Sequence, residues 1–138
     1  MKTLYTATAT AHGGREGHIH SSDGALDVQL RTPKELGGPG GLGTNPEQLF
    51  AAGYAACFES ALRLVARTRK VALKDATVSA HVALGKSEDG NFGLSVVLRG
   101  KLADVPRDQA EALMQAAHEV CPYSRATRGN LDVTLEVE

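Results

Sequence analysis

The stretch of residues 49–58 constrains the fold more than any other part of the chain, because it is apolar on nearly every side when drawn as a helix. Thr44 or Asn45 can cap such a helix and Pro46 suits its first turn, so we predict a helix that runs to about Arg69. A helix that is apolar all round must be buried all round, and one small sheet cannot cover it. We therefore predict an obligate dimer around this helix.

The other segments alternate between strand-like and helix-like patterns. Strands are expected over residues 3–11, 16–21, 26–31, 78–84, 92–98 and 131–137. Asp89-Gly90 is a hairpin signal between the fourth and fifth strands, and a second helix opens at Pro106 and ends at Pro122. The order βββ-α-ββ-α-β is typical of an α+β fold with antiparallel sheets, built as a single domain over residues 1–138.

Charge and composition exclude several classes of protein. The 138 residues carry 15 Lys+Arg against 16 Asp+Glu, and so lack the basic excess of a protein that binds nucleic acid or an anionic membrane. Trp is absent and aromatic residues make up 4% of the chain, which argues against base stacking. The first residues lack the apolar core of a signal peptide, and the apolar run 49–58 is far shorter than the ~18 residues of a membrane span. We expect a cytoplasmic protein.

Two cysteines, Cys57 and Cys121, lie on the two predicted helices. Both should face the same core, where a disulfide comes within reach after modest adjustment. They could be buried structural thiols, or a redox pair, since a cytoplasmic disulfide is more often transient and catalytic. The chain has no CxxC pair and its histidines follow no metal-binding spacing, so we expect no metal site.

Two motifs resemble a known family. Residues 40–58, GGLGTNPEQLFAAGYAACF, resemble the central motif of the organic hydroperoxide resistance (Ohr) proteins of the OsmC/Ohr superfamily. Residues 120–124, VCPYS, resemble the second-cysteine motif of the same family. The resemblance extends over the whole chain in length and element order.

This resemblance implies a thiol peroxidase that reduces alkyl and fatty-acid hydroperoxides to alcohols. It assigns Cys57 as the peroxidatic cysteine, Cys121 as the resolving cysteine, and Arg15 and Glu47 as the other active-site residues. It also implies an intertwined homodimer with two interface sites, a dihydrolipoyl reductant, and no bound cofactor or metal.

The chemistry of a buried thiol gives Arg15 and Glu47 their expected roles. Apolar surroundings raise a thiol pKa, so Cys57 needs a nearby cation, and arginine stays charged. The glycines around Arg15 suggest a mobile loop, and Glu47 would orient the guanidinium. Glu47 and Cys57 are ten residues apart, which on one straight helix is about 15 Å. Either the helix is broken, or Glu47 serves the Cys57 of the other subunit, which is the arrangement we favour.

Apolar residues near the loop at residues 35–43 suggest the substrate class. This loop and Phe50 would form an apolar mouth beside Cys57, with Leu36, Leu42 and Met114 as further lining residues. Such a mouth favours an alkyl or lipid hydroperoxide over hydrogen peroxide.

Two other functions fit the same cysteines. The chain could be a looser OsmC-like peroxidase or general thiol–disulfide exchanger, or a non-catalytic redox sensor that responds when the cysteines join. The absence of a basic surface argues against a sensor bound to DNA.

Overall fold

The computed structural model describes residues 1–138, and the chain divides into two compact units, Met1–Leu49 and Phe50–Glu138. Helix α1 (Pro46–Thr68) begins in the first unit and continues into the second. The single domain expected over residues 1–138 stays a prediction.

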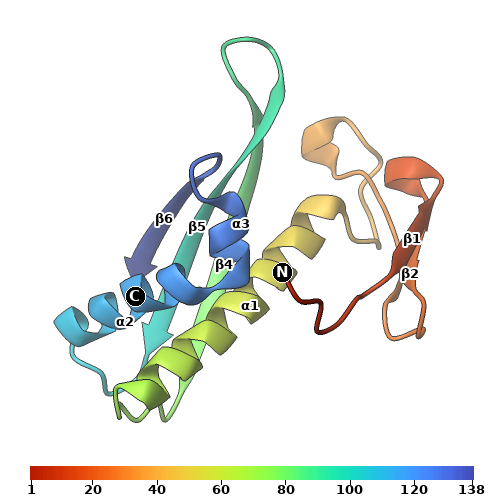
Figure 1. The fold of residues 1–138 in the computed structure, drawn as a ribbon. Helices are drawn as coiled ribbons and strands as arrows, with labels where there is room; N and C mark the ends of the chain where they lie inside the picture. The colour runs from red at the N-terminus through yellow and green to blue at the C-terminus, as the bar shows by residue number, and fades with distance from the viewer. The chain divides into compact units, whose positions relative to one another are not determined.

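The first unit contains a three-stranded antiparallel sheet in the order β1-β2-β3 (Figure 1). Its elements are β1 (Ala9–His12), the 3-10 turn η1 (Gly14–Glu16), β2 (His18–Ser21), β3 (Asp27–Gln29) and the 3-10 turn η2 (Lys34–Leu36). The three antiparallel strands predicted for this region are confirmed.

The first strand is shorter than predicted, because residues 3–8 lie outside it. The pairing of β1 with β2 starts at Ala9 and Ser21, and the chain turns away after Ser21. Residues before Ala9 therefore have no partner strand in the sheet. Leu4 and Tyr5 are accordingly exposed.

The second unit is a three-stranded sheet in the order β4-β5-β6, with helices along one face (Figure 1). Its elements after α1 are β4 (Ala76–Lys86), β5 (Phe92–Leu102), α2 (Arg107–Val120), α3 (Pro122–Thr127) and β6 (Asp132–Val137). The predicted hairpin is confirmed, with Gly90 at φ 82° in its turn and Val82 opposite Val96. Helix α3, after Pro122, is an element the sequence patterns did not predict.

The pairing of β6 was predicted wrongly. We expected antiparallel sheets, but β6 runs parallel to β5, with Val96 opposite Val133 and Leu98 opposite Leu135. After β5, the chain passes through α2 and α3 and returns to the end of the sheet where β5 begins. Strand β6 therefore runs in the same direction as β5. A helical crossover of this kind joins parallel strands.

The core of the second unit lies between the helices and the sheet. Helix α1 buries Tyr54, Phe58, Ala61, Leu62, Val65 and Ala66. Helix α2 buries Ala110, Leu113, Met114 and Ala117. On the sheet, the buried residues are Ala76, Val96, Leu98 and Leu102.

Helix α1 is not buried all round in the single chain, which corrects that expectation. Ala52 and Ala56 are exposed, since the sheet and α2 cover only the opposite side of the helix. The dimer that would supply the missing cover stays a prediction.

The apolar part of α1 is longer than the run at residues 49–58 indicated. The 23 residues of α1 are long and apolar enough to cross a membrane by length and composition, because polar residues such as Glu59 are too few to lower its mean hydropathy. A core helix passes the same test, and α1 packs its buried residues into the second unit. That the chain spans no membrane stays a prediction.

Candidate active site

The two cysteines meet in the second unit. Cys57 lies in the middle of α1, and Cys121 lies at the junction between α2 and α3. Both thiols are free, and their Sγ atoms are 3.5 Å apart although 64 positions separate them in the chain. Cys121 is fully buried and Cys57 is half-buried. A disulfide has an S–S distance of about 2.05 Å, so a small closure would join them.

The surroundings of Cys57 favour the neutral thiol. Burial raises the pKa of Cys57, and the neighbouring Cys121 thiol raises it further. The backbone N–H of Tyr123 opposes this effect and lowers the pKa, because it donates a hydrogen bond to the sulfur and stabilises the thiolate. A nucleophilic Cys57 would therefore need positive charge nearby, as the sequence reasoning required.

Arg15 and Glu47 form a two-point ion pair in the first unit. Nη1 of Arg15 donates to Oε2 of Glu47 at 3.0 Å, and Nη2 donates to Oε1 at 2.7 Å. These bonds hold the pKa of Glu47 below its usual range and raise the pKa of Arg15, so both groups stay charged. Asn45 Oδ1 accepts a hydrogen bond from the backbone N–H of Gln48 and so caps the start of α1. Glu47 therefore lies in the first turn of this helix.

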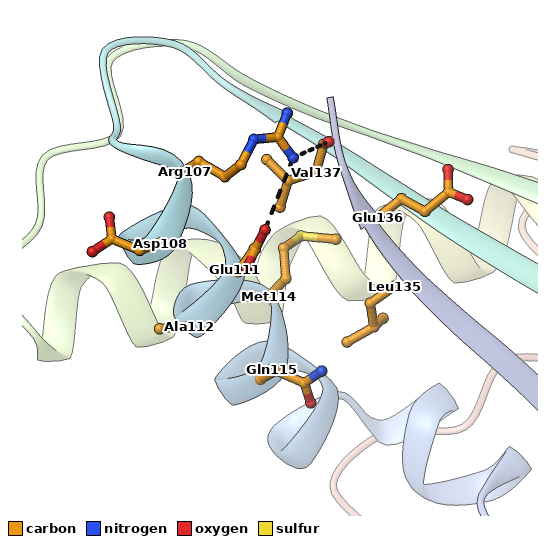
Figure 2. A pocket seen from close by; sticks show the side chains of 9 residues that line it. All are labelled: Arg107, Asp108, Glu111, Ala112, Met114, Gln115, Leu135, Glu136 and Val137. Atoms are coloured by element: carbon orange, nitrogen blue, oxygen red, sulfur yellow. Dashed lines mark hydrogen bonds and ion pairs between the residues drawn. The ribbon is translucent and has the colours of Figure 1, made fainter.

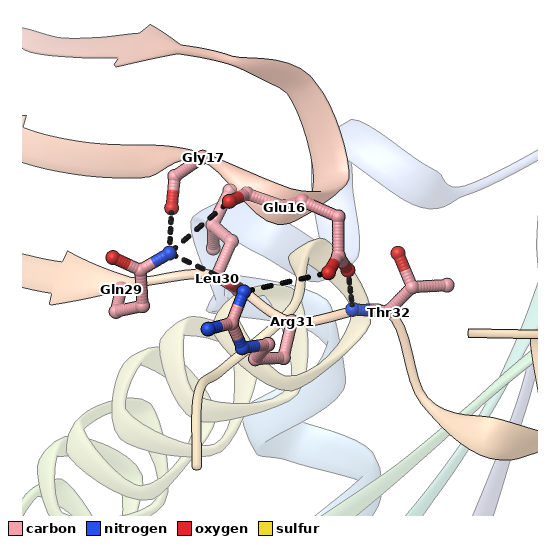
Figure 3. Close-up of polar contacts among 6 residues, drawn as sticks. All are labelled: Glu16, Gly17, Gln29, Leu30, Arg31 and Thr32. Atoms are coloured by element: carbon pink, nitrogen blue, oxygen red, sulfur yellow. Dashed lines mark hydrogen bonds and ion pairs between the residues drawn. The ribbon is translucent and has the colours of Figure 1, made fainter. Parts of the chain in front are cut away.

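A cluster of polar contacts fixes the backbone beside Arg15 (Figure 3). Glu16 accepts the backbone N–H of Thr32, and Gln29 Nε2 donates to the carbonyls of Glu16 and Gly17 at 3.1 and 2.8 Å. A Cβ at Gly17 would lie 1.8 Å from the carbonyl oxygen of residue 12, so only glycine fits there. The structure thus anchors one side of the turn that carries Arg15. The mobility expected of this loop stays a prediction.

The sequence reasoning missed a buried polar group next to the thiols. Tyr54 Oη lies 2.8 Å from Ser124 Oγ and 3.3 Å from Thr127 Oγ1, and His118 Nδ1 lies 2.8 Å from Ser124 Oγ. Tyr54 and Ser124 have no exposed surface. In the sequence, Tyr54 stands three residues from Cys57, and His118 and Ser124 stand three residues from Cys121. This spacing of about one helical turn gains meaning only once the cysteines are seen to meet.

The residues expected to line an apolar mouth lie in different places. Phe50 packs on Tyr54 and Tyr123, with ring centroids 5.9 and 6.4 Å away. Leu36 and Leu42 lie in the first unit and are exposed. For these three residues, a role in binding stays a prediction.

Met114 lines a cavity in the second unit. This cavity, of about 640 Å³, lies between α2 and β6 (Figure 2). Its lining residues are Arg107, Asp108, Glu111, Ala112, Met114, Gln115, Leu135, Glu136 and Val137, and neither cysteine is among them. The same Met114 packs closely over Gly100, where a Cβ would lie 2.6 Å from its sulfur. Met114 therefore contributes to the contact between α2 and the sheet, and its role in lining the substrate site stays a prediction.

The comparisons with known proteins agree on one family. The model of the OsmC-like protein family matches residues 38–136. The chain is 55% identical over 135 residues to an organic hydroperoxide resistance protein of Xanthomonas axonopodis pv. citri, covering 97% of this chain and 94% of that relative. It is 51% identical to organic hydroperoxide resistance protein OhrB of Bacillus subtilis, covering 98% of each.

A solved structure supports the same relationship. The crystal structure of an organic hydroperoxide resistance protein from Legionella pneumophila superposes with a TM-score of 0.94 at 53% identity, covering 99% of each chain. With the family model and the two relatives, this likeness shows that the chain belongs to the OsmC-like family, in its branch of organic hydroperoxide resistance (Ohr) proteins.

Proposed function

We propose that this chain is a cysteine-based peroxidase that reduces alkyl and fatty-acid hydroperoxides to alcohols in the cytoplasm. The observation that carries the proposal is the pair of free thiols, Cys57 and Cys121, with their sulfurs 3.5 Å apart in a largely buried site. The names of the relatives, which specify resistance to organic hydroperoxides, support the substrate class.

The reaction would proceed in three steps. The Cys57 thiolate attacks the terminal oxygen of the peroxide and becomes a sulfenic acid as the O–O bond breaks. The alkoxide that leaves takes up the proton released when the Cys57 thiol ionised, and becomes the alcohol. The Cys121 thiol then displaces water from the sulfenic acid, which forms the Cys57–Cys121 disulfide. An external dithiol of the dihydrolipoyl type reduces this disulfide by thiol–disulfide exchange and is itself oxidised to a disulfide.

Arg15 and Glu47 would supply the charge that this reaction needs. Arg15 would stabilise the thiolate and bond a peroxide oxygen, while Glu47 would hold the guanidinium in place through the two bonds described above. Helix α1 is continuous from Pro46 to Thr68, so the alternative of a broken helix loses its support. On such a helix, Glu47 and Cys57 are separated by about 15 Å along the axis. We therefore propose a homodimer in which Glu47 serves the partner's site.

Turnover of an alkyl hydroperoxide with dihydrolipoamide tests the proposed function. We expect rapid multiple turnovers, with tert-butyl hydroperoxide consumed at a much higher kcat/KM than hydrogen peroxide. A protein disulfide offered in place of the peroxide should react slowly, because the site is suited to peroxide oxygen. A single oxidation without recycling would indicate a redox sensor, and faster reaction with the protein disulfide would indicate a general thiol–disulfide exchanger.

Changing Cys121 to Ser should separate the two halves of the cycle. The first reduction of peroxide should be no slower than in wild type, since Cys57 is retained and one group that raises its pKa is lost. Steady-state turnover with dihydrolipoamide should fall by about tenfold or more because no internal disulfide forms. Stopped-flow kinetics measures the first step, and mass spectrometry identifies the oxidised product. Wild-type protein that shows no internal disulfide after treatment with peroxide would contradict the scheme.

A mixed dimer locates the action of Glu47. One chain carries Cys57→Ser and the other carries Glu47→Ala, and the Glu47→Ala homodimer is the control. If Glu47 serves the partner's Cys57, one site keeps both residues and the mixed dimer should retain about half of the wild-type turnover. Each site of the Glu47→Ala homodimer contributes half of that protein's turnover. Turnover of the mixed dimer no higher than this half would show that Glu47 acts within its own subunit.

A further inference from the structure

We propose that the hydrogen-bonded side chains of Tyr54, Ser124 and His118 form a clasp that holds Cys121 against Cys57 for disulfide closure. The three act as positioning residues, and their side-chain hydrogen bonds go to one another and to Thr127, not to either sulfur. The inference rests on the proposed function in one respect, namely that closure of this disulfide is a step of the cycle.

Each residue of the clasp stands three positions along the chain from one of the two cysteines. Tyr54 stands three residues before Cys57 on α1, and Ser124 stands three residues after Cys121. Their 2.8 Å hydrogen bond therefore ties the two cysteine-bearing segments together about one helical turn from the sulfurs. His118, three residues before Cys121, bonds the same Ser124 hydroxyl across the corner between α2 and α3.

One short segment, residues 121–124, supplies several contacts to α1. Cys121 places its sulfur 3.5 Å from the sulfur of Cys57, and Tyr123 turns its backbone N–H toward that same sulfur. The Tyr123 ring packs 5.7 Å from the ring of Tyr54. Ser124 then provides the hydrogen bond that ties this segment to α1. Because these contacts share one segment, loosening the hydrogen bond should also loosen the approach of the sulfurs.

The number of hydroxyl hydrogens decides which atom donates in each hydrogen bond of the clasp. Thr127 Oγ1 donates to the carbonyl of Ser124, so its contact with Tyr54 requires the tyrosine to donate. Ser124 must then donate to the tyrosine oxygen. The only hydrogen left for the contact between His118 and Ser124 is on Nδ1 of the ring. With Nδ1 protonated, every bond of the clasp has its own hydrogen.

Burial makes these hydrogen bonds costly to break, so they hold the side chains of the clasp in one arrangement. Tyr54 and Ser124 have no exposed surface, so water cannot replace a broken bond without opening the site. No side-chain polar atom is left buried without a partner in residues 1–138, so the clasp satisfies all of its groups. The packed arrangement thus limits the freedom of the segment that carries Cys121, which raises the effective concentration of its thiol at Cys57.

Equilibration with oxidised and reduced dithiothreitol measures that effective concentration without any peroxide. The two cysteine thiols pass two electrons and two protons to the cyclic disulfide of the reagent, which becomes a dithiol as the Cys57–Cys121 bond forms. Tyr54→Phe keeps the ring and removes the hydroxyl. We expect it to lower the equilibrium constant for disulfide formation by about three- to tenfold, the value of one net hydrogen bond. Ser124→Ala removes the bond to His118 as well, so it should lower the constant at least as much. The double variant should add little to Ser124→Ala, since both changes remove the same tie to α1.

Val96→Ala is the matched control, because Val96 is a buried residue of β5 that belongs to the core without joining the clasp. It should lower Tm at least as much as Tyr54→Phe and leave the equilibrium constant unchanged. An equilibrium constant for Tyr54→Phe or Ser124→Ala equal to that of wild type or Val96→Ala would overturn the clasp. If the proposed function alone fails, the variants still shift the equilibrium while wild-type protein does not turn over alkyl hydroperoxide.

Discussion

Changing Cys57 to Ser should abolish turnover of alkyl hydroperoxides, with kcat/KM reduced on the order of a thousandfold or more. The serine hydroxyl has nearly the same shape as the thiol but remains protonated and is a poor nucleophile toward peroxide oxygen. The measurement is peroxide consumption with dihydrolipoamide as reductant. Because Cys57 is only half-buried and the side chains are similar in size, Tm should change little.

The Cys121→Ser variant is the internal control for this loss. It also lacks the disulfide, yet it should still consume peroxide in a first turnover, whereas Cys57→Ser should consume none. A Cys57→Ser protein that reduces peroxide at even a tenth of the wild-type rate would assign the chemistry to another group.

Changing Arg15 to Ala should lower kcat/KM by about a hundredfold, the usual effect of removing one charged group that stabilises a transition state. Burial raises the pKa of the Cys57 thiol, and in the proposed function Arg15 counters this effect, so removing the guanidinium should raise that pKa further. A titration of thiolate absorbance in the ultraviolet measures that change. Arg15→Lys should fall between the two proteins, since an ammonium keeps the charge but cannot make both bonds to Glu47.

Arg99→Ala provides a matched surface control. Arg99 pairs with Glu136 at 2.9 Å and has a side chain about as exposed as that of Arg15, at 44% against 39%. Both ion pairs should contribute little to stability, so neither variant should change Tm by much. Only Arg15→Ala should lose activity. Equal kcat/KM values in the two variants would remove Arg15 from the mechanism.

Local patterns predicted most of the elements. Helix α1 begins at Pro46 after a capping Asn45, as its composition indicated. Alternation predicted strands over residues 78–84 and 92–98, and Asp89-Gly90 predicted the hairpin that joins β4 to β5. These features depend on neighbours within a few residues, so they can be read along the chain.

Errors arose where the outcome depended on a distant partner. Alternating residues look the same in a parallel and an antiparallel strand, so the expected antiparallel pairing of β6 had no local support. The crossover through α2 and α3 makes this strand parallel to β5. Residues 3–8 have strand-like composition but no partner strand in the sheet. The close packing of Met114 over Gly100 likewise joins two distant elements, and no local pattern indicated it.

The sequence by itself determined most of the elements, the two cysteines on core-facing helices, and the motifs that resemble the Ohr proteins. Only the tertiary structure decided that the sulfurs of Cys57 and Cys121 meet, that Arg15 pairs with Glu47, and that Tyr54 bonds Ser124. The reason is physical. Helix and strand signals come from backbone preferences of neighbouring residues, whereas contacts between residues 32, 64 or 70 positions apart depend on how whole elements pack.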